Sequence, residues 1–120
     1  MKKLAVLLFT SVLILSGCGA SANLISKAGE KLEAGNYEEA EAIYSEVTET
    51  GRYVSEGYRG MGICQINQGM YADACVSFEK ALLYADAQSA EYTRDVELYL
   101  AYCRQHHGED DKALEIYNGI

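Results

Sequence analysis

Gly35-Asn36-Tyr37-Glu38-Glu39-Ala40 is the first of three stretches that share one pattern; the others are Gly69-Met70-Tyr71-Ala72-Asp73-Ala74 and Gly108-Glu109-Asp110-Asp111-Lys112-Ala113. Each stretch runs from a glycine to an alanine, and an aromatic residue follows four positions after each alanine, at Tyr44, Phe78 and Tyr117. The first two glycines are 34 residues apart and the next two are 39 apart. A period of this length is typical of chains built from stacked helical hairpins.

The pattern predicts a turn between two antiparallel helices in each unit. Glycine accepts the left-handed conformation that follows a helix end at no steric cost, so each glycine is expected to end a first helix. Small residues would then let the two helices of a hairpin approach closely. We expect these facing positions to be Ala28, Gly62 and Ala101 on the first helices, and Ala40, Ala74 and Ala113 on the second. The aromatic residues would fill the space between one hairpin and the next.

These residues resemble the tetratricopeptide repeat (TPR), whose 34-residue unit is a helix-turn-helix hairpin. The middle unit fits best, with Tyr58-x₂-Met61-Gly62 followed by Ala74-x₃-Phe78. The resemblance implies an all-α fold, a TPR-like α-solenoid of about three helix-turn-helix hairpins, with units at about 21–54, 55–88 and 94–120. The chain departs from the pattern because it has no proline and carries five extra residues around 89–93. We expect that insertion to lengthen a helix or a loop.

The N-terminus has the order of a secretory signal. Met1-Lys2-Lys3 is positively charged, and residues 4–15 form a nearly unbroken apolar run. As a helix this run spans roughly 18 Å, short of the ~30 Å hydrocarbon core of a bilayer. The following Leu15-Ser16-Gly17-Cys18 resembles the lipobox of bacterial lipoproteins. The resemblance implies a signal peptide at 1–17, a lipidated Cys18 with a short linker at 18–20, and a repeat domain at 21–120; the alternative is an ordinary secretory signal with a chance cysteine.

Charge narrows the range of partners and locations. The chain has a formal net charge of −8 at pH 7, and loss of residues 1–17 would remove two lysines and no acid. Such a chain repels nucleic acid and anionic headgroups, so we expect no nucleic-acid partner and a tether through the lipid on Cys18. The expected location is the cell membrane, lipid-anchored, on the extracytoplasmic side.

No stretch of the sequence matches a catalytic or cofactor motif. A Gly-rich phosphate loop, a nucleophile elbow and metal-type histidine spacing are all missing. The two histidines, His106 and His107, are adjacent and would point about 100° apart on a helix. The acidic runs at 38–41 and 109–111 stand where second helices begin, and there they complement the helix dipole. We therefore expect no enzymatic activity, no catalytic residues, no metal and no cofactor.

Three cysteines remain beside Cys18. Cys64 and Cys75 stand at similar distances from the Gly69 turn, and Cys103 matches Cys64 in the next unit. We expect all three to be small buried residues, with no disulfide between Cys64 and Cys75. An extracytoplasmic location permits a disulfide, and the odd number would leave one thiol over.

The first helices of the hairpins are the candidate binding surface, because in TPR arrays they line a concave groove that takes peptides or partner helices. Carried over to this chain, the resemblance places eleven residues there: Glu56, Arg59, Ile63, Ile66, Asn67, Asp95, Leu98, Tyr99, Tyr102, Gln105 and His106. Tyrosine and arginine contribute strongly to binding. The sequence therefore favours a protein- or peptide-binding adaptor or scaffold in the cell envelope. The alternative is a lipoprotein that binds a small ligand or cell-wall fragment through Tyr99 and Tyr102.

The C-terminal hairpin has no following unit to cover Leu114, Tyr117 and Ile120. Stacked repeats bury each hairpin against the next and usually finish with a polar capping helix. We expect either that the full protein continues beyond Ile120 or that another molecule completes the stack. Asn118-Gly119 resembles neither a cap nor a natural stop, which favours the first alternative.

Overall fold

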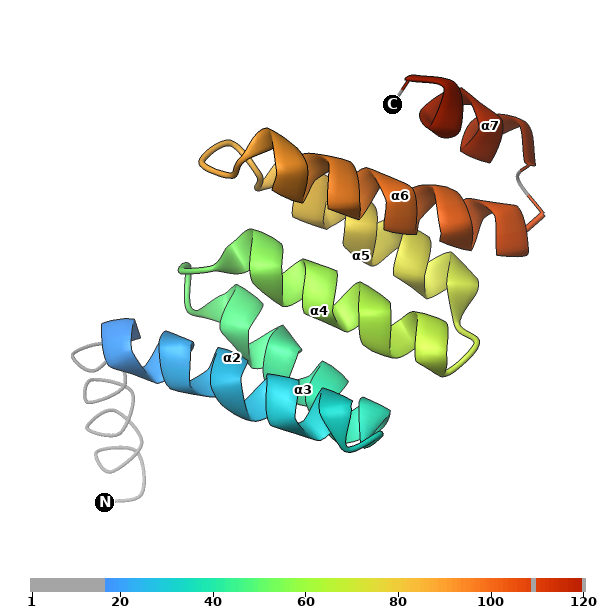
Figure 1. Ribbon diagram of the computed structural model, residues 1–120. Coiled ribbons are helices and arrows are strands. Elements are labelled where there is room, and N and C mark those ends of the chain that lie inside the picture. The colour runs from blue at the N-terminus through green and yellow to red at the C-terminus, as the bar shows by residue number, and fades with distance from the viewer. Residues whose placement is uncertain (1–16, 109, 120) are drawn as a thin grey trace, which may run out of the picture.

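The computed structural model describes residues 17–108 and 110–119, and every element in this part of the chain is an α-helix (Figure 1). The predicted all-α class is thus confirmed. Most of the expected signal peptide and the side chain of Cys18 lie outside the described residues. The helices, in chain order, are α2 (Gly17–Glu33), α3 (Tyr37–Glu49), α4 (Val54–Asn67), α5 (Tyr71–Leu83), α6 (Ala90–His106) and α7 (Asp110–Gly119).

Consecutive helices pack against one another along the whole series, from α2 on α3 to α6 on α7. Smaller contacts join α2 to α4 and α4 to α6. In Figure 1, α2, α4 and α6 accordingly form a front layer, with α3 and α5 behind it. The chain therefore places the first helices of successive hairpins side by side.

The turn glycines adopt the conformation that the sequence predicts. Gly35, Gly69 and Gly108 have φ angles of +79°, +76° and +85°. At the end of α4, the Gly69 N–H donates to the Ile66 carbonyl at 3.0 Å, and the next N–H donates to the Gln65 carbonyl at 2.8 Å. This pair of bonds is the Schellman motif, which satisfies the last carbonyls of a helix.

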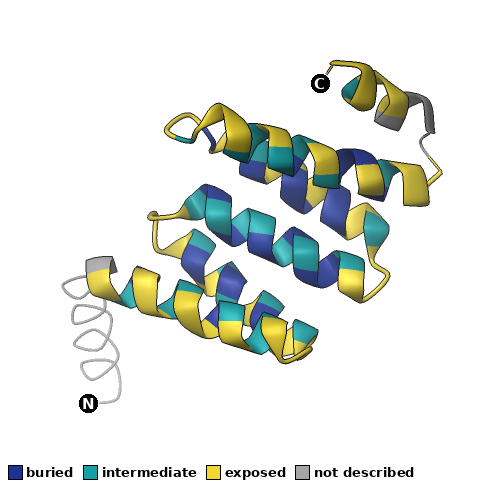
Figure 2. Cartoon of the chain, in the orientation of Figure 1, coloured by how far each residue is buried: buried dark blue, intermediate teal, exposed yellow. Residues whose placement is uncertain are grey.

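The core consists of two clusters of buried side chains. Figure 2 shows that the buried residues are mostly on α3 to α6. The first cluster, between α2, α3 and α4, contains Ala28, Ala40, Tyr44 and Cys64. The second, between α5 and α6, contains Ala74, Cys75, Phe78, Ala81, Val96, Leu100 and Cys103. Ala28, Ala40, Ala74 and Ala101 are all fully buried, as expected for the facing small residues. The side chain of Ala113 lies outside the described residues.

Two glycines let α4 lie directly against aromatic rings. A Cβ at Gly60 would stand 2.4 Å from the ring of Tyr44, and one at Gly62 would stand 2.6 Å from the ring of Phe78. Phe78 also stacks on Tyr99 of α6, with ring centroids 5.2 Å apart. Phe78 therefore fills the space between two hairpins, as predicted.

The five extra residues lengthen both a helix and a loop. Helix α6 has 17 residues where α4 has 14. It begins at Ala90, earlier than the expected unit boundary near 94, because Ser89 caps it by accepting a hydrogen bond from the Tyr92 N–H at 3.1 Å.

Candidate functional site

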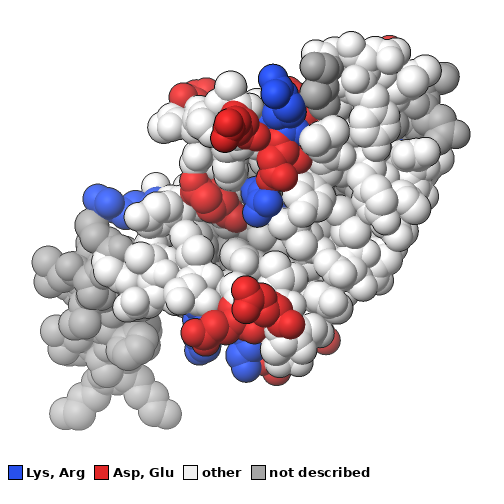
Figure 3. Space-filling model, in the orientation of Figure 1, with Lys and Arg blue, Asp and Glu red and all other residues white. Residues whose placement is uncertain are grey.

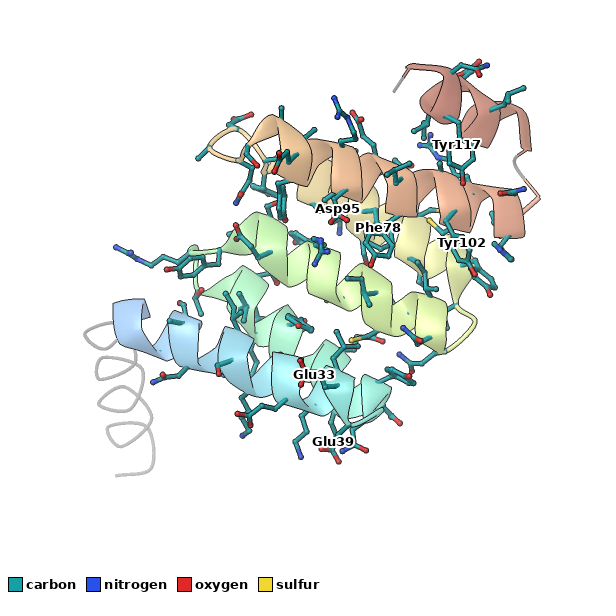
Figure 4. The ribbon with its side chains drawn as sticks, in the orientation of Figure 1. Glu33, Glu39, Phe78, Asp95, Tyr102 and Tyr117 are labelled. Atoms are coloured by element: carbon teal, nitrogen blue, oxygen red, sulfur yellow. The ribbon has the colours of Figure 1, made fainter. Side chains whose placement is uncertain are left out.

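A pocket of about 420 Å³ opens between α4, α6 and α7, and Figure 4 shows three of its side chains, Asp95, Tyr102 and Tyr117. Its lining is Ile66, Asp95, Leu98, Tyr99, Tyr102 and Tyr117. The TPR resemblance predicts five of these six residues on the inner surface. The sixth, Tyr117, is predicted instead to fill the space between hairpins. Leu98, Tyr102 and Tyr117 are 43%, 40% and 40% exposed, so the pocket presents apolar surface to solvent.

An ion pair closes the polar end of this pocket. The Arg59 Nε on α4 donates to the Asp95 Oδ2 on α6 at 2.7 Å. The guanidinium also lies 5.4 Å from the centre of the Tyr99 ring, within the range of a cation–π contact. Arg59 was expected to be an available binding residue. Because Asp95 already accepts from it, a ligand would have to share or displace that bond.

At the other end of the pocket, Tyr102 contacts a stack of two rings, His106 and Tyr71. His106, in the last turn of α6, lies 4.3 Å from Tyr102 and 4.9 Å from Tyr71 between ring centroids. Tyr71 comes from the start of α5 and was not recognised as a site residue in the sequence. The sequence shows only that Tyr71 stands two residues after the turn glycine. This position does not predict a contact with α6. The stack holds Tyr102 at the edge of the pocket.

Six of the eleven predicted inner-surface residues are outside the pocket lining. Arg59 and His106 contact residues of the lining, and the other four lie elsewhere. Ile63 is partly buried against the second core cluster. The Asn67 Nδ2 donates to the Ile63 carbonyl at 2.9 Å, within its own helix. Gln105 is exposed, and the carboxylate of Glu56 accepts a hydrogen bond from the Gln88 side chain. The structure therefore gathers part of the predicted groove, from Arg59 to His106, around one pocket.

A buried hydroxyl, that of Ser55 on α4, contacts both α5 and α6. The Ser55 Oγ donates to the Ala81 carbonyl of α5 at 2.7 Å and lies 2.9 Å from the Tyr92 hydroxyl of α6. Burial raises the pKa of Tyr92, although its hydrogen bond with Ser55 acts in the opposite direction. These contacts join the start of α4 to the end of α5 and the start of α6. They lie at the opposite end of α6 from His106.

Charged side chains gather elsewhere on the face that carries the pocket. In Figure 3 they form one group over the α2–α3 turn and another over the middle of the stack, while the surface over the C-terminal ends of α4 and α6 is almost uncharged. In the first group, Lys31 Nζ and Glu39 Oε2 are 2.9 Å apart. This hydrogen bond raises the pKa of Lys31 and lowers that of Glu39.

A second hollow, of about 480 Å³, lies between α3 and α4. It is lined by Glu38, Glu41, Ala42, Ser45, Met61, Gln68 and Met70. The Gln68 Nε2 bridges it by donating to the Glu41 Oε1 at 2.8 Å and to the Cys64 carbonyl at 3.0 Å. Its carboxylates make it a less apolar surface than the pocket between α4, α6 and α7.

The described residues contain neither a metal-type cluster nor a helix that could span a membrane. Among the side chains that the structure describes, no three of His, Cys, Asp or Glu lie close enough together to hold a metal ion. Of the six helices, none is both long enough and apolar enough to cross a bilayer.

No protein-family model matches the chain, and a comparison with curated proteins also finds no match. The resemblance to tetratricopeptide repeats and to lipoprotein signals therefore rests on the residues of this chain alone.

Proposed function

We propose that the protein is a lipid-anchored adaptor or scaffold of the cell envelope, in which a TPR-like solenoid binds a protein or peptide. The pocket between α4, α6 and α7 carries this proposal, because its lining comes mainly from the first helices of two successive hairpins. This is the surface on which the TPR resemblance predicts peptide binding. The partly exposed Leu98 and Tyr102 suit it to an apolar side chain of the partner.

The side chains at the two ends of the pocket suggest how a peptide would be oriented in it. Aromatic rings at the Tyr102 end offer apolar contact, whereas the Arg59–Asp95 pair at the other end offers donors and an acceptor for backbone groups. A short segment with an apolar anchor, lying along α6, would use both. The anchor residue would displace water from the pocket, which is the favourable term in most associations.

Capture from a detergent extract of envelope proteins tests this proposal, with the full chain as bait. The bait is compared with two matched double variants, Leu98→Ala with Tyr102→Ala in the pocket, and Leu83→Ala with Tyr84→Ala on the exposed end of α5. The first pair should weaken capture of a specific protein by roughly 30-fold or more, if these residues are anchors. The second pair should leave capture unchanged. Equal capture by all three folded baits, judged by circular dichroism, would refute the groove.

The lipid anchor is the second part of the proposal, and it rests on Leu15-Ser16-Gly17-Cys18. Metabolic labelling with a fatty acid should mark the wild-type chain. Cys18→Ala should abolish both the label and the cleavage, leaving an uncut precursor, whereas Cys64→Ala should keep the label. Label retained on the Cys18→Ala chain would rule out the anchor.

A small-ligand function is the alternative, and the pocket volume favours it specifically. About 420 Å³ falls within the range of ~300–1,000 Å³ common for small-molecule sites. Tyr99 and Tyr102 would then stack on a sugar or muropeptide. Calorimetry with purified cell-wall fragments separates the two functions. A heat of binding that the wild type shows and Tyr102→Ala lacks supports the alternative. The adaptor is supported if the wild type shows no heat of binding but captures a specific protein.

A further inference from the structure

Two cysteine side chains from neighbouring helices meet in the second core cluster. The Cys75 Sγ on α5 lies 3.1 Å from the Cys103 Sγ on α6 and donates a hydrogen bond to it. Cys103 in turn donates to the Leu100 carbonyl at 3.3 Å. A disulfide needs the sulfur atoms at about 2.05 Å, so they would have to approach by about 1 Å. This movement is shorter than one carbon–carbon bond, which is about 1.5 Å.

The other hairpin junction offers an internal comparison. Cys75 and Glu41 each stand six residues after a turn glycine, and Cys103 and Cys64 each stand five residues before one. Glu41 and Cys64 therefore occupy, between α3 and α4, the places that the two cysteines occupy between α5 and α6. Cys64 belongs to the first core cluster, beside Ala28 and Ala40. The fold thus separates Cys64 from Cys75 and brings Cys75 to Cys103.

We propose that Cys75 and Cys103 are a disulfide-forming pair that covalently joins α5 to α6 in the presence of a disulfide oxidant. The Cys75 thiolate attacks one sulfur of the oxidant and releases one oxidant thiol. The Cys103 thiolate then attacks the Cys75 sulfur of the mixed disulfide and releases the second thiol. Two electrons pass from the protein to the oxidant, and the two protein protons end on the oxidant thiols. The S–S bond of the oxidant is replaced by the bond in the protein.

The burial of the pair determines when this reaction is fast. Cys75 is 7% exposed and Cys103 is fully buried, and this burial raises the pKa of the Cys103 thiol. The reactive thiolate is therefore scarce in the packed state. The bond forms fastest while α6 is docking or transiently open, and once formed it is shielded from reductants. This order suits a structural crosslink made during folding in an oxidising compartment.

The bond would also act on the candidate groove, although the proposal does not depend on it. Cys103 directly follows Tyr102, so a crosslink there holds the aromatic end of α6 against α5. The closed loop would include the whole connection between α5 and α6, and closing it lowers the entropy of the unfolded chain. We expect the oxidised protein to melt roughly 10 °C above the reduced protein.

The test oxidises the reduced full chain with oxidised glutathione, both in the folded state and during refolding from urea. Samples are quenched in acid, alkylated in denaturant and digested without reduction for mass spectrometry. We expect a linked Cys75–Cys103 peptide as the main product of refolding, with Cys64 recovered alkylated. Alkylated or glutathione-bound Cys75 and Cys103 under both conditions would overturn the proposal, as would a bond from either one to Cys64.

Three variants complete the test. Cys64→Ala should keep the bond, and its redox-dependent melting shift should match that of the wild type. Cys103→Ala should melt at one temperature whether oxidised or reduced, whatever its stability. Glu41→Cys places a thiol at the equivalent junction and should add a second bond, from position 41 to Cys64. A melting shift that persists in Cys103→Ala would show that another group responds to the oxidant and would contradict the proposal.

Discussion

Arg59 on α4 and Asp95 on α6 form an ion pair, Nε to Oδ2 at 2.7 Å, that joins the first helices of two hairpins beside the candidate pocket. Both side chains are partly exposed, at 31% and 44%. A pair in this environment gains little over its hydrated state, because water screens the charges and ordering both side chains costs entropy. The pair therefore serves more to orient Tyr99 and the pocket edge than to stabilise the fold.

A double-mutant cycle with Arg59→Ala and Asp95→Ala measures that contribution. We expect a coupling of about 0.5 kcal/mol in urea unfolding at 0.1 M salt. It should fall at 1 M salt, where the Debye length shrinks from about 10 Å to about 3 Å. The pair between Arg104 and Glu79, also 2.7 Å long, is the matched control and should behave alike. A salt-independent coupling above about 2 kcal/mol would contradict this view.

Gly62 should tolerate no side chain, because its Cβ position is already occupied by the Phe78 ring at 2.6 Å. Gly62→Ala is expected to destabilise the protein by about 1–3 kcal/mol, the usual cost of overpacking a core. Gly29 is the control, since nothing lies within 4 Å of its Cβ position in α2. Gly29→Ala should be neutral or stabilising by up to about 1 kcal/mol, because alanine favours the helix. Equal effects in urea unfolding would show that α4 does not pack on Phe78 as described.

The hairpin pattern could be read from the sequence because its signals are local. A glycine with a positive φ angle, such as Gly69, follows the first helix of each hairpin, and the spacing of small residues follows from one helix facing the next. The burial of Ala28, Ala40 and Ala74 was predictable for the same reason. The grouping of Leu98, Tyr99 and Tyr102 on α6 was predicted from the TPR resemblance, and these three residues line one pocket.

The details of the pocket were not predictable, since they depend on the register and rotation of helices from different hairpins. The bond from Arg59 to Asp95, the ring contact of Tyr71 with His106 and the meeting of Cys75 with Cys103 all cross such a junction. A shift of one helical turn would remove all of them without changing any local pattern. The five-residue insertion around 89–93 makes the register of α6 harder to predict. The sequence alone does not show how many of the extra residues belong to the helix and how many to the loop.

A buried polar pair, Ser77 and Gln65, links α5 to α4 within the second hairpin. The Ser77 Oγ donates to the Gln65 Oε1 at 2.6 Å, and the two residues are only 4% and 6% exposed. Ser77→Ala would leave that oxygen buried without its donor, at a cost of about 1–3 kcal/mol in unfolding free energy. Adding Gln65→Leu should recover most of the loss, because both polar partners are then replaced. If the double variant is less stable than Ser77→Ala alone, the hydrogen bond is not the source of the cost.

Stability should fall at alkaline pH, because four buried or half-buried groups, the thiols of Cys64 and Cys103 and the phenols of Tyr44 and Tyr92, hold their protons more tightly in the folded state. Burial raises the pKa of the Cys64 thiol from 9.0 to about 11, and it also raises the pKa values of Tyr44 and Tyr92. The unfolded chain releases these protons at the ordinary values, so the folded chain binds more protons between about pH 9 and 11. The free energy of unfolding is therefore fully retained below about pH 9 and decreases as pH rises through 11.

Urea unfolding at pH 7, 9, 10 and 11 measures this loss, and tyrosinate absorbance follows the ionisation of the tyrosines as a group. The thiol of Cys64 should account for roughly 2–3 kcal/mol of it, since a pKa difference of one unit corresponds to about 1.4 kcal/mol. Cys64→Ala removes one titrating group but leaves Cys103 and both tyrosines, so the stability of the reduced variant should decline less steeply with pH. If wild type and Cys64→Ala lose stability in parallel, the buried thiol is not what couples folding to pH.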